Sequence, residues 1–251
     1  MKGKLLRVVL PLAFWLAVWE AAAHLLGKEL FLPTVEAVVR SLGELAVTGA
    51  FWRSAGATLL RVAAGLAAGI LLGALLAGAT CSWVWLPRLL APAIRIVRAT
   101  PVASFILLVL LWTGRNSVPA VISALMVLPV VWENLVRGIQ AADPQLLELA
   151  RAYRFSRKKI LTLIYLPSLR PYFLSAVTTA MGLAWKSGVA AEVLCQPQNA
   201  IGTQIYNTKY YLETPSLFAW TLVVIALSFL LEWAVGGLLR RAEGPEGGRR
   251  P

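Results

Sequence analysis

The longest uncharged segment of the chain, residues 62–87, constrains the fold more than any other feature. It exceeds the roughly 20 apolar residues with which an α-helix crosses a lipid bilayer. Within it, Gly65, Gly69 and Gly73 recur every four residues, which predicts close packing against another helix. The composition agrees, because 59% of the residues are hydrophobic and 14% are charged, too few charges to cover a soluble globule. We therefore expect an all-α protein that crosses a membrane several times.

The distribution of apolar runs predicts about six transmembrane helices. The predicted spans cover residues 8–19, 58–78, 99–114, 117–132, 171–185 and 216–231. A cleavable signal peptide would share the charged start of the first span, but nothing that follows resembles a secreted domain, so a retained span is favoured. Residues 34–46 place their apolar side chains on one helical face, which predicts an interfacial helix. The polar residues 196–215 are predicted to form an external loop.

Positive charges predict the orientation of these helices. The chain has 24 Lys and Arg against 12 Asp and Glu, a net charge of +12. With the N-terminus inside, 17 basic residues fall in segments predicted inside and five in segments predicted outside. The inner segments with basic residues are 2–7, 88–98, 137–170 and 240–250. Cys81 is predicted to lie in an inner loop and Cys195 in an outer one. This asymmetry follows the positive-inside rule, so both termini are predicted to be cytoplasmic. The basic residues lie between apolar runs and not along one polar face, so we expect no nucleic-acid partner.

Residues 143–167 form the only long, strongly basic segment between apolar runs. Asp143 is a suitable N-cap with Pro144 in the first helical position, and Ser156 offers a second N-cap before Arg157. Apolar residues recur at helical spacing after each cap. The segment therefore predicts two short helices joined by a turn.

The same segment resembles the EAA loop of ABC importer permeases, whose pattern is EAA, three residues, Gly, nine residues and I-x-L-P. The chain keeps this pattern at Glu148, Ala150, Ile164, Leu166 and Pro167. Leu149 replaces the middle Ala, and Arg154 stands where the family has a Gly at the turn. Since Arg in a left-handed turn costs roughly 1–2 kcal/mol, we expect the turn to shift toward Phe155 and Ser156. Two further stretches, TLLRVAAG at 58–65 and AWKSGVAAEVL at 184–194, resemble the nitrate, sulfonate and taurine type of permease.

This resemblance implies a permease subunit in the cell (inner) membrane that forms the path for a small solute. The solute would be a nitrate-, sulfonate- or taurine-like anion or a small organic compound. The implied partners are ABC ATPase subunits, an extracytoplasmic substrate-binding protein and a second permease, which makes a homodimer or a heterodimer. The residues implied to dock on the ATPase are Glu148, Leu149, Ala150, Arg151, Arg154 and Ser156.

The resemblance also implies a division of the chain. Residues 1–33 would hold the first transmembrane helix, and residues 34–238 the permease domain with the coupling loop 143–167. Residues 239–251 would form a basic cytoplasmic tail, expected to be disordered because it is rich in Gly, Pro and Arg.

Prolines and charges in the predicted spans are candidates for the translocation path. Pro101 and Pro129 remove backbone hydrogen bonds, which membrane helices tolerate where a neighbour or water satisfies the freed carbonyl. A kink that only improves packing is the alternative. Lys186 and Glu192 are the charged residues at the end of the fifth span. Lys186 either reaches water or pairs with a carboxylate, or it faces the path and attracts an anionic solute.

The sequence lacks the parts of an enzyme. No GxxxxGK[ST] phosphate loop occurs, so ATP hydrolysis is expected in a separate chain. Cys81, Cys195 and His24 are too few for a metal site, and we expect no catalytic residue, cofactor or metal. The main alternative function is a secondary membrane carrier, but such carriers commonly show internal repeats, which we do not find. An intramembrane enzyme would need a cluster of titratable or nucleophilic residues, which is not present.

Overall fold

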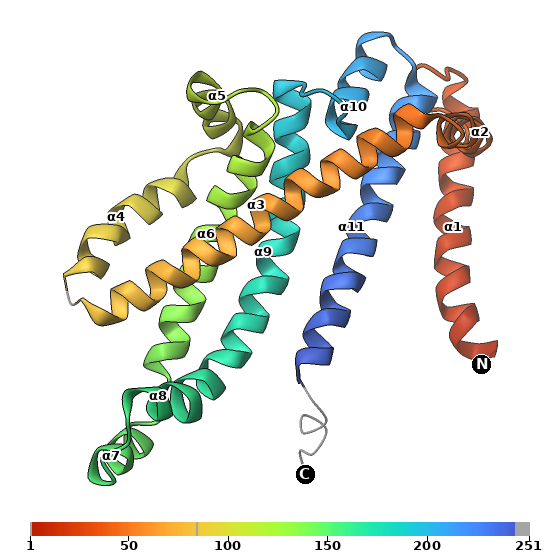
Figure 1. The fold of residues 1–251 in the computed structure, drawn as a ribbon. Helices are drawn as coiled ribbons and strands as arrows, with labels where there is room; N and C mark the ends of the chain where they lie inside the picture. The colour runs from red at the N-terminus through yellow and green to blue at the C-terminus, as the bar shows by residue number, and fades with distance from the viewer. Residues whose placement is uncertain (1, 84, 244–251) are drawn as a thin grey trace.

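The computed structural model describes residues 2–83 and 85–243, and within these ranges every regular element is a helix (Figure 1). In chain order the helices are α1 (Lys2–Leu26), α2 (Val35–Ala46), α3 (Gly49–Ser82), α4 (Leu86–Ala99), α5 (Val102–Trp112), α6 (Val118–Gln140), α7 (Pro144–Ala152), α8 (Arg157–Ile160), η1 (Leu161–Tyr165), α9 (Leu166–Cys195), α10 (Ile201–Tyr210) and α11 (Thr214–Glu243). The π-helical turn η1 joins α8 to α9, so one helix runs over Arg157–Cys195. The prediction of an all-α fold is confirmed.

Among the described residues, five helices are long and apolar enough to cross a membrane: α1, α3, α6, the joined α8–α9 and α11. Together α4 and α5 supply a sixth candidate, bent by 109° between them. Pro101 precedes α5 directly, and Thr100 before it is extended because proline disfavours the helical conformation in the preceding residue. The prediction of about six spans is confirmed. Residues 88–98, predicted to be an inner loop, belong instead to α4.

Helices α3, α6 and α9 form the centre of the molecule, where α3 crosses the other two diagonally (Figure 1). A Cβ atom on Gly69 would lie 2.6 Å from Cβ of Val127 and 2.8 Å from the carbonyl oxygen of Ala124 on α6. Cβ atoms on Gly65 and Gly73 would be similarly crowded by α6. The predicted close packing at the three glycines is therefore confirmed, and α6 is the helix that they approach.

The same side of α3 also meets α9. A Cβ atom on Gly188 of α9 would lie 2.7 Å from both the Ser123 hydroxyl oxygen and a methyl group of Val62. The Ser123 hydroxyl donates a hydrogen bond to the carbonyl oxygen of Ala184 at 3.0 Å. Small residues and one buried hydroxyl thus let three helices meet at a single level.

The first two helices lie at the edge of the molecule, with α2 crossing the direction of α1 (Figure 1). The indole N–H of Trp19 donates to the carbonyl oxygen of Pro33 at 2.9 Å, and a Glu20 carboxylate oxygen accepts from the N–H of Val35 at 2.9 Å. The Thr34 hydroxyl caps α2 by accepting from the N–H of Ala37 at 3.2 Å. These bonds fix the connection between α1 and the amphipathic α2, which packs against α11.

Two predictions about polar segments are wrong. Residues 196–215, predicted to form a loop, contain the helix α10. The tail predicted to be disordered from residue 239 is helical as far as Glu243, because no Gly or Pro interrupts residues 238–243. Residues 244–251 lie outside the described residues. Cys81, predicted in a loop, lies in the last turn of α3.

Candidate functional site

Helices α7 and α8 form a helical hairpin that projects from one end of the molecule (Figure 1). The Asp143 carboxylate accepts from the N–H of Gln145 at 2.8 Å, and Pro144 fills the first position of α7. The Ser156 hydroxyl accepts from the N–H of Lys159 at 3.4 Å, at the start of α8. Both predicted N-caps are present, so the two short helices begin where the sequence indicates.

The turn between these helices does not shift as predicted. Arg154 itself takes the left-handed conformation, with φ 51°. The N–H of Phe155 donates to the Ala150 carbonyl at 2.8 Å, and the N–H of Arg154 donates to the Arg151 carbonyl at 3.0 Å. These two bonds form a Schellman motif, which satisfies carbonyl groups that the helix end would otherwise leave unpaired. The motif offsets the cost of a left-handed Arg, so the geometry of a glycine turn is kept without the glycine.

Ala150 lies inside this hairpin and not on its surface. It is 1% exposed and packs with Ala142 and Ile164 in a small apolar core. Leu147 and Ile160 pack against the same core. Ala150 therefore presents almost no surface to a partner in this conformation, and a larger side chain there would separate α7 from the start of the long helix. Ala150 and Ile164 keep the hairpin together.

The other predicted docking residues are exposed on the hairpin: Glu148, Leu149, Arg151, Arg154 and Ser156. We call this exposed surface of residues 146–156 the docking surface. It carries one carboxylate, that of Glu148, and two guanidinium groups, those of Arg151 and Arg154, together with exposed apolar side chains. Such a mixed surface is typical of an interface between proteins.

Lys186 is exposed on α9, on a face that no other described helix covers. The exposed residues beside it recur at helical spacing and are mostly small or polar: Ser175, Thr178, Thr179 and Ala190. No ion pair among the described residues includes Lys186, so the predicted pairing with a carboxylate is not seen. The same face also exposes two large apolar side chains, Leu183 and Leu194.

Glu192 is fully buried and joins three helices. One carboxylate oxygen accepts from Arg61 of α3 at 3.1 Å, and the other accepts from the Thr58 hydroxyl at 2.8 Å and the N–H of Gly202 at 3.2 Å. Thr58 in turn accepts from the N–H of Ile201 at 3.0 Å. The first turn of α10 is therefore held against α3 and α9. In this conformation the Glu192 carboxylate presents no surface to a solute.

The two candidate prolines lie in different surroundings. Pro129 is buried within α6, whereas Pro101 is exposed at the bend between α4 and α5. For neither residue is a role in the path tested by the structure. Within the described ranges no group of three His, Cys, Asp or Glu side chains is placed to hold a metal ion.

Comparison of the sequence with known protein families identifies the family of this chain. Residues 65–244 match the family described as the binding-protein-dependent transport system inner membrane component. The chain belongs to this family. The match spans α6 to α10 completely, and so it includes the whole hairpin with its docking surface. The likeness to ABC importer permeases that rests on residues 148–167 is thereby confirmed.

Named relatives and a solved structure agree with this family. The taurine transport system permease protein of Escherichia coli is 26% identical over 238 residues, which cover 92% of this chain and 86% of the relative. A putative aliphatic sulfonates transport permease protein of the same species is 31% identical over 219 residues, covering 85% and 82%. The crystal structure of an amino acid ABC transporter with histidines superposes with a TM-score of 0.63 over 80% of this chain and 96% of that chain. At 19% identity this last likeness shows a shared fold.

The docking surface of this permease also includes three apolar side chains that were not among the docking residues predicted from the sequence. Leu146, Tyr153 and Phe155 are large apolar side chains with 46%, 71% and 37% exposure. The Lys159 ammonium lies 5.6 Å from the centre of the Phe155 ring, a cation–π contact that orders the end of the turn. The spacing of residues 146, 149 and 153 indicates that they share one helical face. The spacing alone does not distinguish a face exposed to a partner from a face packed inside the chain.

Proposed function

We propose that this permease works with ATPase subunits and a substrate-binding protein to import a small anion, and that a second copy completes the path. The docking surface supports the ATPase contact, because it projects away from the helical bundle and exposes apolar side chains that need a covering partner. A displacement of α7 would also displace the membrane-spanning part of α9, since α8, η1 and α9 form one helix over Arg157–Cys195.

An anionic solute agrees with two observations. Lys186 provides a positive charge on an uncovered face of a membrane-spanning helix. Relatives are named as permeases for taurine, aliphatic sulfonates, nitrate and bicarbonate, whose sulfonate groups or ions are anionic. We further propose that α7, α8 and both termini are cytoplasmic, because the basic hairpin and the start of α1 lie at the same end of the molecule (Figure 1).

The substitution Glu148→Lys tests the docking surface. It reverses an exposed charge without touching the apolar core of the hairpin, so we expect normal membrane insertion. We expect uptake to fall severalfold and ATP hydrolysis by the reconstituted complex to lose its dependence on the binding protein. Glu44→Lys on α2, which also reverses an exposed carboxylate, is the matched control and should transport normally. Normal coupling by the Glu148→Lys complex would show that the ATPase docks elsewhere.

A further inference from the structure

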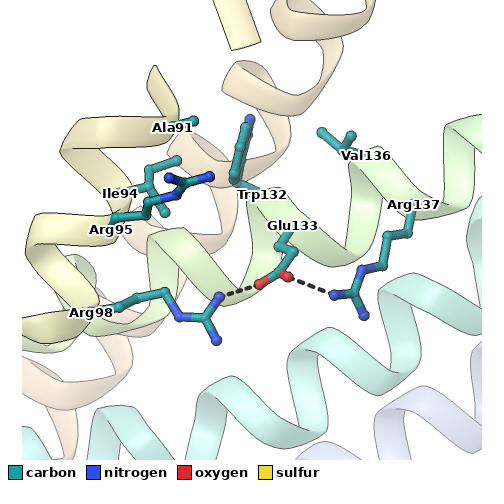
Figure 2. A pocket seen from close by; sticks show the side chains of 8 residues that line it. All are labelled: Ala91, Ile94, Arg95, Arg98, Trp132, Glu133, Val136 and Arg137. Carbon is teal, nitrogen blue, oxygen red and sulfur yellow. Dashed lines mark hydrogen bonds and ion pairs between the residues drawn. The ribbon is translucent and has the colours of Figure 1, made fainter. Parts of the chain in front are cut away.

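A cavity of about 320 Å³ lies between α4 and α6, and none of its lining residues belongs to the docking surface (Figure 2). Its polar lining consists of Arg95, Arg98, Glu133, Arg137 and the indole of Trp132, and the rest of the wall is apolar. The volume is at the lower end of the range of pockets that hold small molecules. Both walls belong to segments that are long and apolar enough to cross the membrane.

The charges of this cavity do not balance. Glu133 accepts from Arg98 at 2.5 Å with one carboxylate oxygen and from Arg137 at 2.6 Å with the other (Figure 2). Arg95, whose guanidinium extends toward Trp132 in Figure 2, has no ion pair or hydrogen bond among the described residues. Three guanidinium groups therefore face one carboxylate that is already shared by two of them. All three arginine side chains are exposed, so the positive charge of the cavity is accessible to an anion from solution.

A second observation concerns Trp132. Its indole N–H is buried and, like that of Trp185, has no hydrogen-bond partner among the described residues, although buried N–H groups are almost always paired. The indole nitrogen can only donate, so a partner for it must be an acceptor. An oxyanion can accept two parallel bonds from the Arg95 guanidinium, and it would accept a further bond from Trp132 once the indole turns its N–H toward the cavity.

We propose that this cavity binds a small oxyanion, of the sulfonate or nitrate class, through the guanidinium of Arg95 and the indole N–H of Trp132. Arg98 and Arg137 add positive potential, while Glu133 keeps them in place. The inference rests on the proposed import of an anion, for which the cavity would be a binding subsite. A lipid phosphate has the same acceptor chemistry, so the test must separate the two sources.

The test uses the complete permease–ATPase complex in nanodiscs of neutral phosphatidylcholine. Calorimetric titration with sodium methanesulfonate and sodium nitrate, at constant ionic strength in chloride, measures binding. Arg95→Gln removes the one guanidinium whose loss leaves both bonds of Glu133 intact, and we expect binding about tenfold weaker or more. Trp132→Phe keeps the ring and removes the N–H, and we expect weakening of severalfold. Arg88→Gln, an exposed residue of α4 outside the cavity, is the control and should bind as the unmodified complex does.

Equal binding by the Arg95→Gln and unmodified complexes would overturn the site, and so would the absence of binding to both anions. A parallel arm adds phosphatidylglycerol to the nanodiscs and measures by mass spectrometry how much of it the complex retains. If only this lipid is retained, and Arg95→Gln releases it, the assignment to a soluble anion is wrong. The complex with Glu148→Lys should still bind methanesulfonate, so failure of the docking proposal and failure of this site are separate results.

Discussion

Glu192 shows how one buried charge can join distant parts of the chain. Its side chain is 0% exposed and that of its partner Arg61 is 17% exposed. Arg61 also donates to the carbonyl oxygens of Gln198 and Asn199, in the segment just before α10. Both carboxylate oxygens of Glu192 and both terminal nitrogens of Arg61 therefore have hydrogen-bond partners, which favours the persistence of a buried ion pair.

Glu192→Ala should destabilise the protein strongly. The substitution leaves Arg61, Thr58 and the N–H of Gly202 without their acceptor, and breaking a buried pair in this way costs about 3–5 kcal/mol. Glu36→Ala is the matched control, because Glu36 pairs with Arg40 on the exposed surface of α2 and its loss costs at most about 1 kcal/mol. Thermal unfolding of the purified protein in detergent measures both. Similar unfolding temperatures for the two variants would contradict the structural role of Glu192.

Substitution of Lys186 tests whether its charge contributes to the translocation path. We expect Lys186→Met to keep expression and assembly while uptake of an anionic solute falls severalfold, because the charge that attracts the anion is lost. Lys186→Arg should retain part of the uptake. Lys209→Met removes an exposed charge on α10 and serves as the control. Unchanged uptake by the Lys186→Met variant would leave Lys186 only a structural role.

At the level of single residues, the sequence identifies candidates but not their neighbours. Local rules place the caps Asp143 and Ser156, since the capped N–H lies within three residues along the chain. The surroundings of Glu192 depend on Arg61, 131 residues earlier, and no local pattern links the two. For the same reason the sequence could not distinguish an inward-facing Ala150 from an outward-facing one.

Among the helices, the contact between α3 and α6 depends on the absence of side chains. Glycines at every fourth position form a groove along α3, and side chains of α6 such as Val127 and Val131 fill it. In a bilayer this close approach provides van der Waals contact that the hydrophobic effect does not supply between helices. The two helices are thereby fixed in register along their shared length.

Gly69→Ala should disrupt this contact. The added methyl carbon would lie 2.6 Å from Cβ of Val127, so the helices must separate locally, at a cost of about 1–3 kcal/mol. Gly56→Ala on the same helix is the control, because nothing lies within 4 Å of its added carbon. That control should be neutral or slightly stabilising, since Ala favours the helix. Equal thermal stability of the two variants in detergent would contradict the packing.

The sequence predicts most helices but not how they bend or end. Long apolar runs identify the spans because the bilayer sets their length. The joint of α4 with α5 was missed because the arginines of residues 88–98 match a cytoplasmic loop as well as a helix lining a charged cavity. The helix α10 was missed because its first N–H groups are satisfied by Thr58 and Glu192 from other helices.

For the molecule as a whole, the all-α class and the number of spans follow from composition and periodicity. The arrangement of α3, α6 and α9 around one centre does not, because it depends on contacts between residues far apart in sequence. The bend of 109° between α4 and α5 starts locally, at the extended Thr100 before Pro101, but both segments then pack against α6, a contact that no local pattern predicts. The cavity of Arg95 lies at the contact of α4 with α6.

Cysteine labelling tests the proposed orientation of the whole molecule. Cys81 is exposed in the last turn of α3, whereas Cys195 at the end of α9 is 3% exposed. With both termini cytoplasmic, a membrane-impermeant maleimide should label Cys81 in inside-out vesicles and not in intact cells. Cys195 should stay unlabelled from either side until the protein is denatured, so the two thiols act as internal references for each other. Cys81→Ser removes the signal and identifies the labelled site, and labelling of Cys81 in intact cells would reverse the orientation.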